Sequence, residues 1–183
     1  MKVRMASRSD AAELLGIYKW FIDNTAATFE YTAPTAEAFG ERIDNVLKNY
    51  PYLVAISEGR IVGYAYAARF NERAAASVSA ELSVYVAHDF RGNGTGSLLY
   101  REIERILVMQ NVYTVYADIT CGNENSIRFH EKCGYKKAGH LHNCGYKMGQ
   151  WLDLVLMEKQ LKEPAVTPER FVPITELSEC LDL

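Results

Sequence analysis

Arg91-Gly92-Asn93-Gly94-Thr95-Gly96 lies between an apolar, strand-like run from Leu82 to Ala87 and an amphipathic run with helical spacing from Ser97 to Gln110. Glycines at every second position let the chain adopt positive φ angles and let a ligand approach the backbone closely. The helix start that follows offers N–H groups without intrahelical partners and the positive end of a helix dipole. The stretch therefore predicts a turn that binds an anion, most simply a pyrophosphate.

The spacing of the glycines narrows the choice of phosphate ligand. A P-loop needs G-x-x-x-x-G-K-[ST] and a dinucleotide-binding turn needs G-x-G-x-x-G, whereas the glycines here run G-x-G-x-G without a lysine. A glycine-rich loop that only turns the chain is the plain alternative. The pattern Arg-x-x-Gly-x-Gly resembles the acyl-CoA pyrophosphate signature of the GCN5-related N-acetyltransferases (GNAT).

The resemblance extends beyond this turn. The segment from Asn123 to Tyr135 resembles the second CoA-side segment of that family, and the run from Ser79 to Val86 resembles the strand before the turn. With Thr28-Phe29-Glu30 and Trp151-Leu152-Asp153, the chain is similar to the phosphinothricin and methionine sulfone/sulfoximine acetyltransferase branch over residues 1 to 161. The resemblance implies an α/β fold with a mixed central sheet of six to seven strands flanked by helices.

Length and composition indicate one globular domain. The chain has 183 residues, of which 49% are hydrophobic and 23% charged, enough for one buried core. We expect the domain to span residues 1–162. The tail, residues 163–183, contains Pro164, Pro168 and Pro173, and we expect it to dock on the domain or to be partly disordered.

Charge and hydropathy exclude several classes of partner. The net charge of −3 and the scattered basic residues argue against a nucleic-acid surface. No apolar run reaches the length of a membrane span, and the N-terminus lacks a continuous apolar segment, so we expect a cytoplasmic protein without a membrane partner. A homodimer is the expected assembly.

The cysteines indicate free thiols. Cys121, Cys133, Cys144 and Cys180 show no C-x-x-C spacing and fit a reducing compartment. His140-x-His142-x-Cys144 would place three metal-ligand side chains on one face of a strand, but Asn143-Cys144-Gly145 also fits a plain turn and no fourth ligand is nearby in sequence. We therefore predict no metal.

The expected elements alternate between strand and helix. A first strand at Lys2–Met5 is followed by a helix that a capping box of Asp10 and Glu13 would open. The other expected elements are a helix from Pro34 to before Pro51, a hairpin around Glu58-Gly59, strands at Val78–Ala87 and Val112–Ile119, a short helix at Asn123–Cys133, and a closing pair at Tyr135–Leu141 and Gln150–Met157.

Acyl transfer to an amine needs a neutral nucleophile, a polarised thioester carbonyl and a proton for the leaving thiolate. Glu81 lies five residues before Val86 on the strand that leads into the turn, near the expected acyl end of a docked CoA. It would accept the ammonium proton, directly or through water. Ser79 and Ser83 share its face by strand alternation. An ordinary solvent-facing carboxylate is the alternative.

The resemblance implies acetyl-CoA as co-substrate and a strand splayed from its neighbour to admit it. Backbone groups of Val84, Tyr85 and Val86 would pair with the pantetheine amides, and one N–H would polarise the thioester carbonyl. Asn123 and Ser126 match family positions near the pantetheine and the phosphates, although Asn123 also suits a helix N-cap. The remaining expected CoA contacts are Arg91, Gly92, Asn93, Gly94, Thr95, Gly96 and Ser97.

His130 stands where many members of the wider superfamily have the tyrosine that protonates the CoA thiolate, and the phosphinothricin-type branch resembles this chain in having histidine there. A histidine titrates near neutrality and could serve as that acid. A partly buried helix residue packed against the sheet is an equally weighted alternative.

For the acceptor, Phe29 matches a family position that lines the amino-acid pocket. Arg73 is the only cation in the loop before Glu81, where a guanidinium would bind a carboxylate in a bidentate pair. Ser79 completes the predicted acceptor set. The run from Ala74 to Ser77 replaces a bulkier stretch of the branch, which leaves the precise acceptor open.

We expect transfer of an acetyl group from acetyl-CoA to the α-amine of a small amino-acid-like acceptor in a ternary complex. A covalent acyl-enzyme is disfavoured because neither Cys121 nor Cys133 has a visible histidine-and-acid arrangement. Acetylation of a protein N-terminus, a lysine or a polyamine is the rival among enzymes. A non-catalytic CoA-sensing module is the rival from another class, and Glu81 argues against it.

Overall fold

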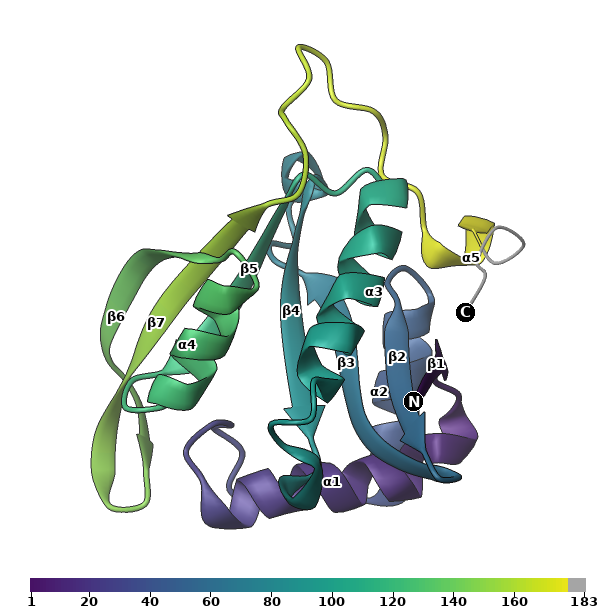
Figure 1. The fold of residues 1–183 in the computed structure, drawn as a ribbon. Helices are drawn as coiled ribbons and strands as arrows, with labels where there is room; N and C mark the ends of the chain where they lie inside the picture. The colour runs from purple at the N-terminus through teal and green to yellow at the C-terminus, as the bar shows by residue number, and fades with distance from the viewer. Residues whose placement is uncertain (178–183) are drawn as a thin grey trace.

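The computed structural model describes residues 1–177, which form a seven-stranded sheet with strand order β1-β2-β3-β4-β5-β7-β6 (Figure 1). In this described part every neighbouring pair of strands is antiparallel except β4 and β5, which are parallel. A parallel pair needs a crossover, and α3 supplies it. The expected mixed α/β sheet is confirmed.

The strands and helices follow the order that the sequence predicts, with the addition of α5 in the tail, which the sequence did not predict. Their bounds are β1 Lys2–Met5, α1 Ala11–Asn24, α2 Ala36–Leu47, β2 Tyr52–Ser57, β3 Arg60–Arg69, β4 Ser79–Val86, α3 Thr95–Met109, β5 Thr114–Thr120, α4 Glu124–Lys132, β6 Lys136–Lys147, β7 Gln150–Gln160 and α5 Ile174–Leu177. The closing hairpin, β6 and β7, is longer than predicted.

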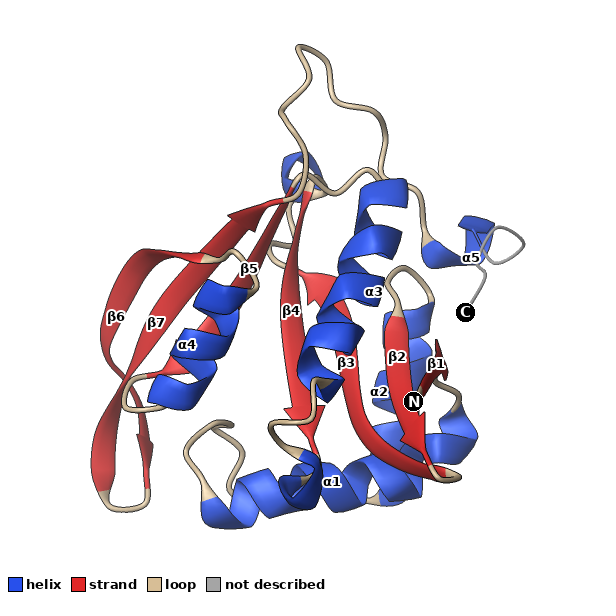
Figure 2. Ribbon diagram, viewed as in Figure 1, coloured by secondary structure: helices blue, strands red, loops and turns tan. Residues whose placement is uncertain are grey.

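Helices cover both faces of the sheet (Figure 2). On one face, α1 and α2 bury Leu14, Ile22 and Ile43 against Val54 and Ile61 of the sheet. On the other face, α3 presents a buried apolar stripe to β2, β3 and β4, and α4 lies beside it. The sheet therefore separates two apolar layers, and its central strands are buried on both sides.

The start of α1 differs from the prediction. The capping box is formed by Ser7 and Asp10, not by Asp10 and Glu13. The Ser7 N–H donates to Asp10 Oδ2 at 2.8 Å, and Arg4 donates to both oxygens of the same carboxylate at 2.7 and 2.8 Å. Because Asp10 is engaged by β1 and by Ser7, it does not cap α1 with its side chain.

The C-terminal segment contacts the domain between residues 170 and 174. The ring of Phe171 lies 5.0 Å from that of Tyr50, and the Val172 and Ile174 N–H groups each donate at 3.0 Å to carbonyls of Gln110 and Asn49. The predicted tail beyond residue 177, with Cys180, lies outside the described residues. No helix within residues 1–177 is long and apolar enough to cross a membrane.

Candidate active site

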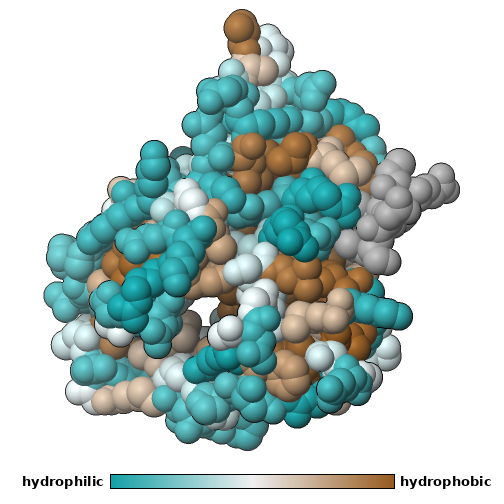
Figure 3. Space-filling view, in the orientation of Figure 1, coloured by the Kyte–Doolittle hydropathy of each residue, from teal (hydrophilic) through white to brown (hydrophobic). Residues whose placement is uncertain are grey.

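The central feature of the site is the divergence of β4 from β5. β4 pairs with β3 from Ala80 to Val86, but only Ser79, Ala80 and Glu81 pair with β5. From residue 82 onward, the backbone groups of β4 that face β5 have no strand partner in the described chain. In space-filling view an opening passes through the surface between α4 and the end of β4 (Figure 3). Such an edge can accept an extended amide-containing ligand as an added strand.

The glycine turn closes one end of this opening and begins α3. Gly92 has φ +80° and Gly94, the N-cap, has φ +80°, a conformation that favours glycine. The first bond of the helix runs from Leu98 N–H to the Gly94 carbonyl at 2.9 Å, and no side chain caps the N-terminus. The N–H groups of Gly96 and Ser97 in the first turn are therefore available to an anion, whereas Thr95 is buried.

Gly96 differs from the other two glycines. Its backbone is not left-handed, and a Cβ there would lie 3.2 Å from ring atoms of Phe129. The expectation that all three glycines serve positive φ angles is therefore wrong for this one. Gly96 is needed because α3 packs closely on α4.

Arg91 fixes the turn against α1. Its guanidinium carbon lies 4.4 Å from the centroid of the Trp20 ring and 4.8 Å from that of Phe21. Cation–π contacts of this kind orient the side chain while leaving its N–H groups at the rim. Burial lowers the pKa of Arg91 from its usual value, but a guanidinium stays charged at neutral pH.

Glu81 lies at the vertex where β4 and β5 part. It is the last β4 residue in the parallel ladder, opposite Tyr116, and it pairs with Ala68 of β3 on the other side. Burial raises the pKa of Glu81, and the charge of Asp118 raises it further. Within residues 1–177 its carboxylate has no hydrogen-bond or ion-pair partner. A raised pKa and a carboxylate without a partner are properties of a general base, and the catalytic role of Glu81 remains a prediction.

The face that Glu81 shares is lined by tyrosines. Leu82 packs in the α3-side core, so alternation directs Glu81 and Tyr85 toward α1 and α2. Tyr85 stacks on Tyr64 with ring centroids 5.2 Å apart, and Tyr52 stacks on Tyr66 at 5.0 Å. Burial raises the pKa of Tyr66, and the Glu81 charge raises it too. These rings form a rigid wall beside the carboxylate.

The loop between α1 and α2 is held over this face by distant residues. The buried Lys147 ammonium donates to the carbonyls of Thr25 and Thr28 at 2.9 and 2.8 Å. Thr120, the last residue of β5, donates to the Ala26 carbonyl at 2.7 Å. We call residues 25–33 the acceptor-side loop.

Comparison with known proteins identifies the family. The model of the acetyltransferase (GNAT) domain matches residues 3–156. The chain belongs to the GNAT acetyltransferase family. It is 31% identical over 177 residues to phosphinothricin N-acetyltransferase of Streptomyces viridochromogenes, which covers 97% of this chain and 96% of the relative.

Two further GNAT relatives lie at the same level of similarity. The L-methionine sulfoximine/L-methionine sulfone acetyltransferase of Pseudomonas aeruginosa is 32% identical, over 91% of this chain and 98% of the relative. The crystal structure of a phosphinothricin acetyltransferase from Sinorhizobium meliloti in complex with AcCoA superimposes with a TM-score of 0.87 at 32% identity, covering 92% of each chain. The resemblance to this branch is confirmed.

The three predicted acceptor residues of this GNAT chain lie in different environments. The ring of Phe29, in the acceptor-side loop, lies so close to Gly145 of β6 that a Cβ there would be 2.5 Å away. Ser79 is buried and donates to the Ala76 carbonyl at 2.9 Å. Arg73 is exposed in the loop between β3 and β4, and its guanidinium has no hydrogen-bond or ion-pair partner among residues 1–177. The assignment of these residues to the acceptor remains a prediction.

Sequence reasoning missed a second arginine on this face. Arg42 of α2 pairs with Glu30 of the acceptor-side loop at 2.6 Å, and the charge of Glu30 also acts on Tyr18 and Tyr66. Lys147 was missed as well. Neither residue belongs to a local motif, so no signal in the sequence alone would have connected them to the loop.

The predicted residues of α4 are engaged in local contacts. The Asn123 side chain caps the helix by accepting from the Ser126 N–H at 3.3 Å. His130 is buried, its Nδ1 donates to the Ser126 carbonyl at 2.8 Å, and its Nε2 lies 2.7 Å from the Tyr100 hydroxyl. Burial lowers the pKa of His130, so the ring is neutral at neutral pH. This environment favours the packing interpretation of His130, while the acid role stays an untested prediction.

Proposed function

We propose that this chain acetylates the α-amine of a small amino-acid-like acceptor with acetyl-CoA, by direct transfer in a ternary complex. The observation that carries the proposal is Glu81, a partly buried carboxylate at the vertex between β4 and β5 that has no partner among residues 1–177. The face of β4 that carries Glu81 is the one covered by the acceptor-side loop. The glycine turn follows the other end of the same strand. A ligand that extends along β4 from the turn would place its acyl end beside this carboxylate.

The roles of the binding groups follow from this geometry. The first-turn N–H groups of α3 and the rim of Arg91 suit a pyrophosphate. The free edge of β4 from Val84 to Val86 suits the pantetheine amides, and an N–H on that edge suits the thioester oxygen as it becomes negative. The residues present therefore fit acetyl-CoA.

Glu81 takes the proton that must leave the amine. The amine nitrogen attacks the thioester carbonyl carbon once its ammonium proton has passed to Glu81, directly or through water. The carbon–sulfur bond then breaks, and the thiolate gains the second proton, which the nitrogen loses as the amide forms, so that CoA leaves as the thiol. A base at this position contributes typically 10²- to 10⁴-fold in rate.

The acceptor class is supported by the three named relatives and by two arginines. Acceptors that carry a carboxylate would meet Arg73 at the entrance or Arg42 beside Glu30. Acceptors that are polyamines or lysines would need additional carboxylates near the amine. The test is a panel of amino acids, sulfone and sulfoximine analogues, polyamines and peptides, assayed for CoA thiol released from acetyl-CoA. Turnover confined to peptides or polyamines would contradict the proposal.

A homodimer is proposed from the surface of the closing hairpin. Leu141, Tyr146, Met148 and Trp151 of β6, β7 and their turn expose 47%, 50%, 56% and 66% of their surface. Apolar groups gathered in this way mark a protein contact surface. Sedimentation analysis of the wild type and of Trp151→Asp tests this: we expect a dimer that dissociates in the variant, and a monomeric wild type would refute it.

A further inference from the structure

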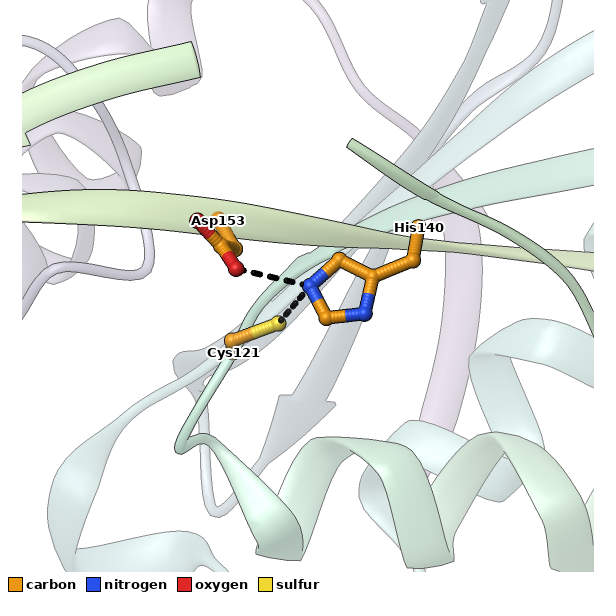
Figure 4. A group of neighbouring side chains, drawn as sticks. All are labelled: Cys121, His140 and Asp153. Carbon is orange, nitrogen blue, oxygen red and sulfur yellow. Dashed lines mark hydrogen bonds and ion pairs between the residues drawn. The ribbon is translucent and has the colours of Figure 1, made fainter. Parts of the chain in front are cut away.

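A group of metal-ligand side chains lies at the base of the closing hairpin, apart from the proposed active-site carboxylate. Cys121 follows the end of β5, His140 belongs to β6 and Asp153 to β7, and their ligand atoms lie within 4.8 Å of one another (Figure 4). A second histidine, His142, places its Nδ1 3.2 Å from the same Asp153 oxygen. Three potential ligands thus converge from three strands or their ends, and His142, which contacts Asp153, lies at the edge of the group.

The way in which these atoms meet excludes a catalytic triad. The Asp153 carboxylate and the Cys121 sulfur both contact Nε2 of His140, at 2.8 and 3.5 Å. In Figure 4 both dashed lines end on the same ring nitrogen. A relay from acid to histidine to nucleophile needs both ring nitrogens, one for each partner. Ligand atoms that gather around one ring nitrogen instead resemble the arrangement around a metal ion.

The local backbone creates this convergence. Strand alternation would put His140, His142 and Cys144 on one face, but the β6–β7 register shifts between Leu141 and Gly145. The irregularity turns the Cys144 thiol to the carbonyls of Leu141 and Leu152. The rings of His140 and His142 stack with centroids 4.3 Å apart, and both contact Asp153. Cys144, the third member of the triplet in the sequence, therefore does not join this group. The cysteine of the group is Cys121.

We propose that Cys121, His140 and Asp153 bind a Zn²⁺ ion, with His142 completing a tetrahedral shell after its exposed side chain turns toward the ion. Zinc bonds of about 2.0 Å to nitrogen and oxygen and about 2.3 Å to sulfur place neighbouring ligand atoms roughly 3.3–3.5 Å apart. The contact of 2.8 Å between His140 and Asp153 would open by about half an ångström, and the contact of 3.5 Å between Cys121 and His140 already has this spacing. One thiolate, two imidazoles and one carboxylate form a donor set that suits zinc.

An outer contact supports the carboxylate in this role. The Asn143 N–H donates to Asp153 Oδ1 at 2.8 Å, which leaves Oδ2 to face the two imidazoles. Hydrogen bonds of this kind orient ligands in metal sites. The Cys121 N–H also donates to the Asp153 carbonyl at 2.9 Å, so the turn and β7 are already aligned.

The ion would join the turn that begins α4 to the hairpin. Cys121 and Gly122 lead directly to Asn123, the cap of α4, and α4 borders the opening beside β4. A bound ion would therefore stabilise one wall of the site. The inference does not depend on the proposed acceptor or on catalysis.

The test uses the full chain in a non-thiol reductant, with ZnCl₂ as the only probe. We expect one zinc per chain after dialysis, a raised melting temperature, and a thiolate-to-metal charge-transfer band when Co²⁺ replaces zinc. Cys121→Ser should weaken zinc binding by at least the roughly 10- to 100-fold that loss of an outer contact costs, and should abolish the band. Cys144→Ser is the matched control on the same hairpin and should bind as the wild type does.

His142→Ala keeps the test decisive if Cys121→Ser does not fold, because the His142 side chain is 71% exposed and its loss leaves the core intact. It should weaken binding while retaining the melting temperature of the zinc-free protein. Zinc bound equally by the wild type and by His142→Ala, equal loss in Cys144→Ser, or substoichiometric zinc in the wild type would each overturn the proposal.

Discussion

Replacing Glu81 by glutamine should separate catalysis from stability. The amide has nearly the same volume, and the carboxylate has no protein partner within residues 1–177, so the substitution breaks no contact of the described fold. If Glu81 is the base, its loss should cost about 10²- to 10⁴-fold in kcat, which is roughly 2.7–5.5 kcal/mol of activation free energy. The affinity for acetyl-CoA should stay near that of the wild type.

The same variant should be more resistant to heat. Burial and the Asp118 charge raise the folded pKa of Glu81, so the folded protein holds the proton more tightly than the unfolded chain. Folding stability then falls as the pH rises from the unfolded pKa through the folded pKa, and the penalty is fully present at neutral pH. Glutamine removes this penalty, so the melting temperature at pH 7 should rise.

The assay measures CoA thiol release over a pH series, with thermal melts and acetyl-CoA titrations on the same samples. Glu131→Gln, an exposed carboxylate on α4, is the matched control and should change neither activity nor melting temperature. Turnover that is unchanged in Glu81→Gln would move the base elsewhere. A lowered melting temperature would show that the carboxylate stabilises the fold, which the reasoning excludes.

Three other substitutions test neighbouring parts of the site. Asp118→Asn removes the like charge that adds to the burial effect on Glu81, so the acidic limb of the kcat/KM profile should move to lower pH; a limb that stays in place would contradict the coupling. Gly94→Val forces φ +80° on a β-branched residue and should abolish the acetyl-CoA-induced rise in melting temperature, whereas a full rise would refute the pyrophosphate turn. Arg73→Ala should lower kcat/KM about ten- to a hundredfold for an amino acid, equivalent to roughly 1.5–3 kcal/mol, and hardly at all for the amide of that amino acid. Equal losses for the two substrates would show that Arg73 does not bind the acceptor carboxylate.

The conformation of the glycine turn was predictable because the turn is contiguous in sequence. The turn from Arg91 to Ser97 contains its own glycines and helix start, and the flanking apolar runs show which strand and helix it joins. Gly96 is the exception within this turn. A glycine is needed there because the ring of Phe129 on α4 lies against it, a contact that depends on tertiary packing.

Two mistakes arise where the sequence allows two local arrangements and the fold selects one. Both Ser7-x-x-Asp10 and Asp10-x-x-Glu13 fit a capping box, and the ion pair from Arg4 to Asp10 at 2.7 Å helps to explain why the first one forms. On the closing hairpin, alternation assigned Cys144 to the face of the histidines. The register shift after Leu141 reversed that assignment, and local sequence carries no clear sign of it.

The acceptor side could not be predicted because distant residues hold it in place. Thr120 ends β5, which forms one wall of the opening beside β4, and Thr120 also binds the Ala26 carbonyl of the acceptor-side loop. Lys147 of β6 binds the same loop at Thr25 and Thr28. β5 pairs with β7 from Thr114 to Thr120, and β7 pairs with β6 on both sides of the register shift, so Thr120 and Lys147 hold the loop from one continuous sheet. If a ligand between β4 and β5 changes the affinity for a ligand under the loop, linkage requires the second ligand to change the affinity for the first by the same factor.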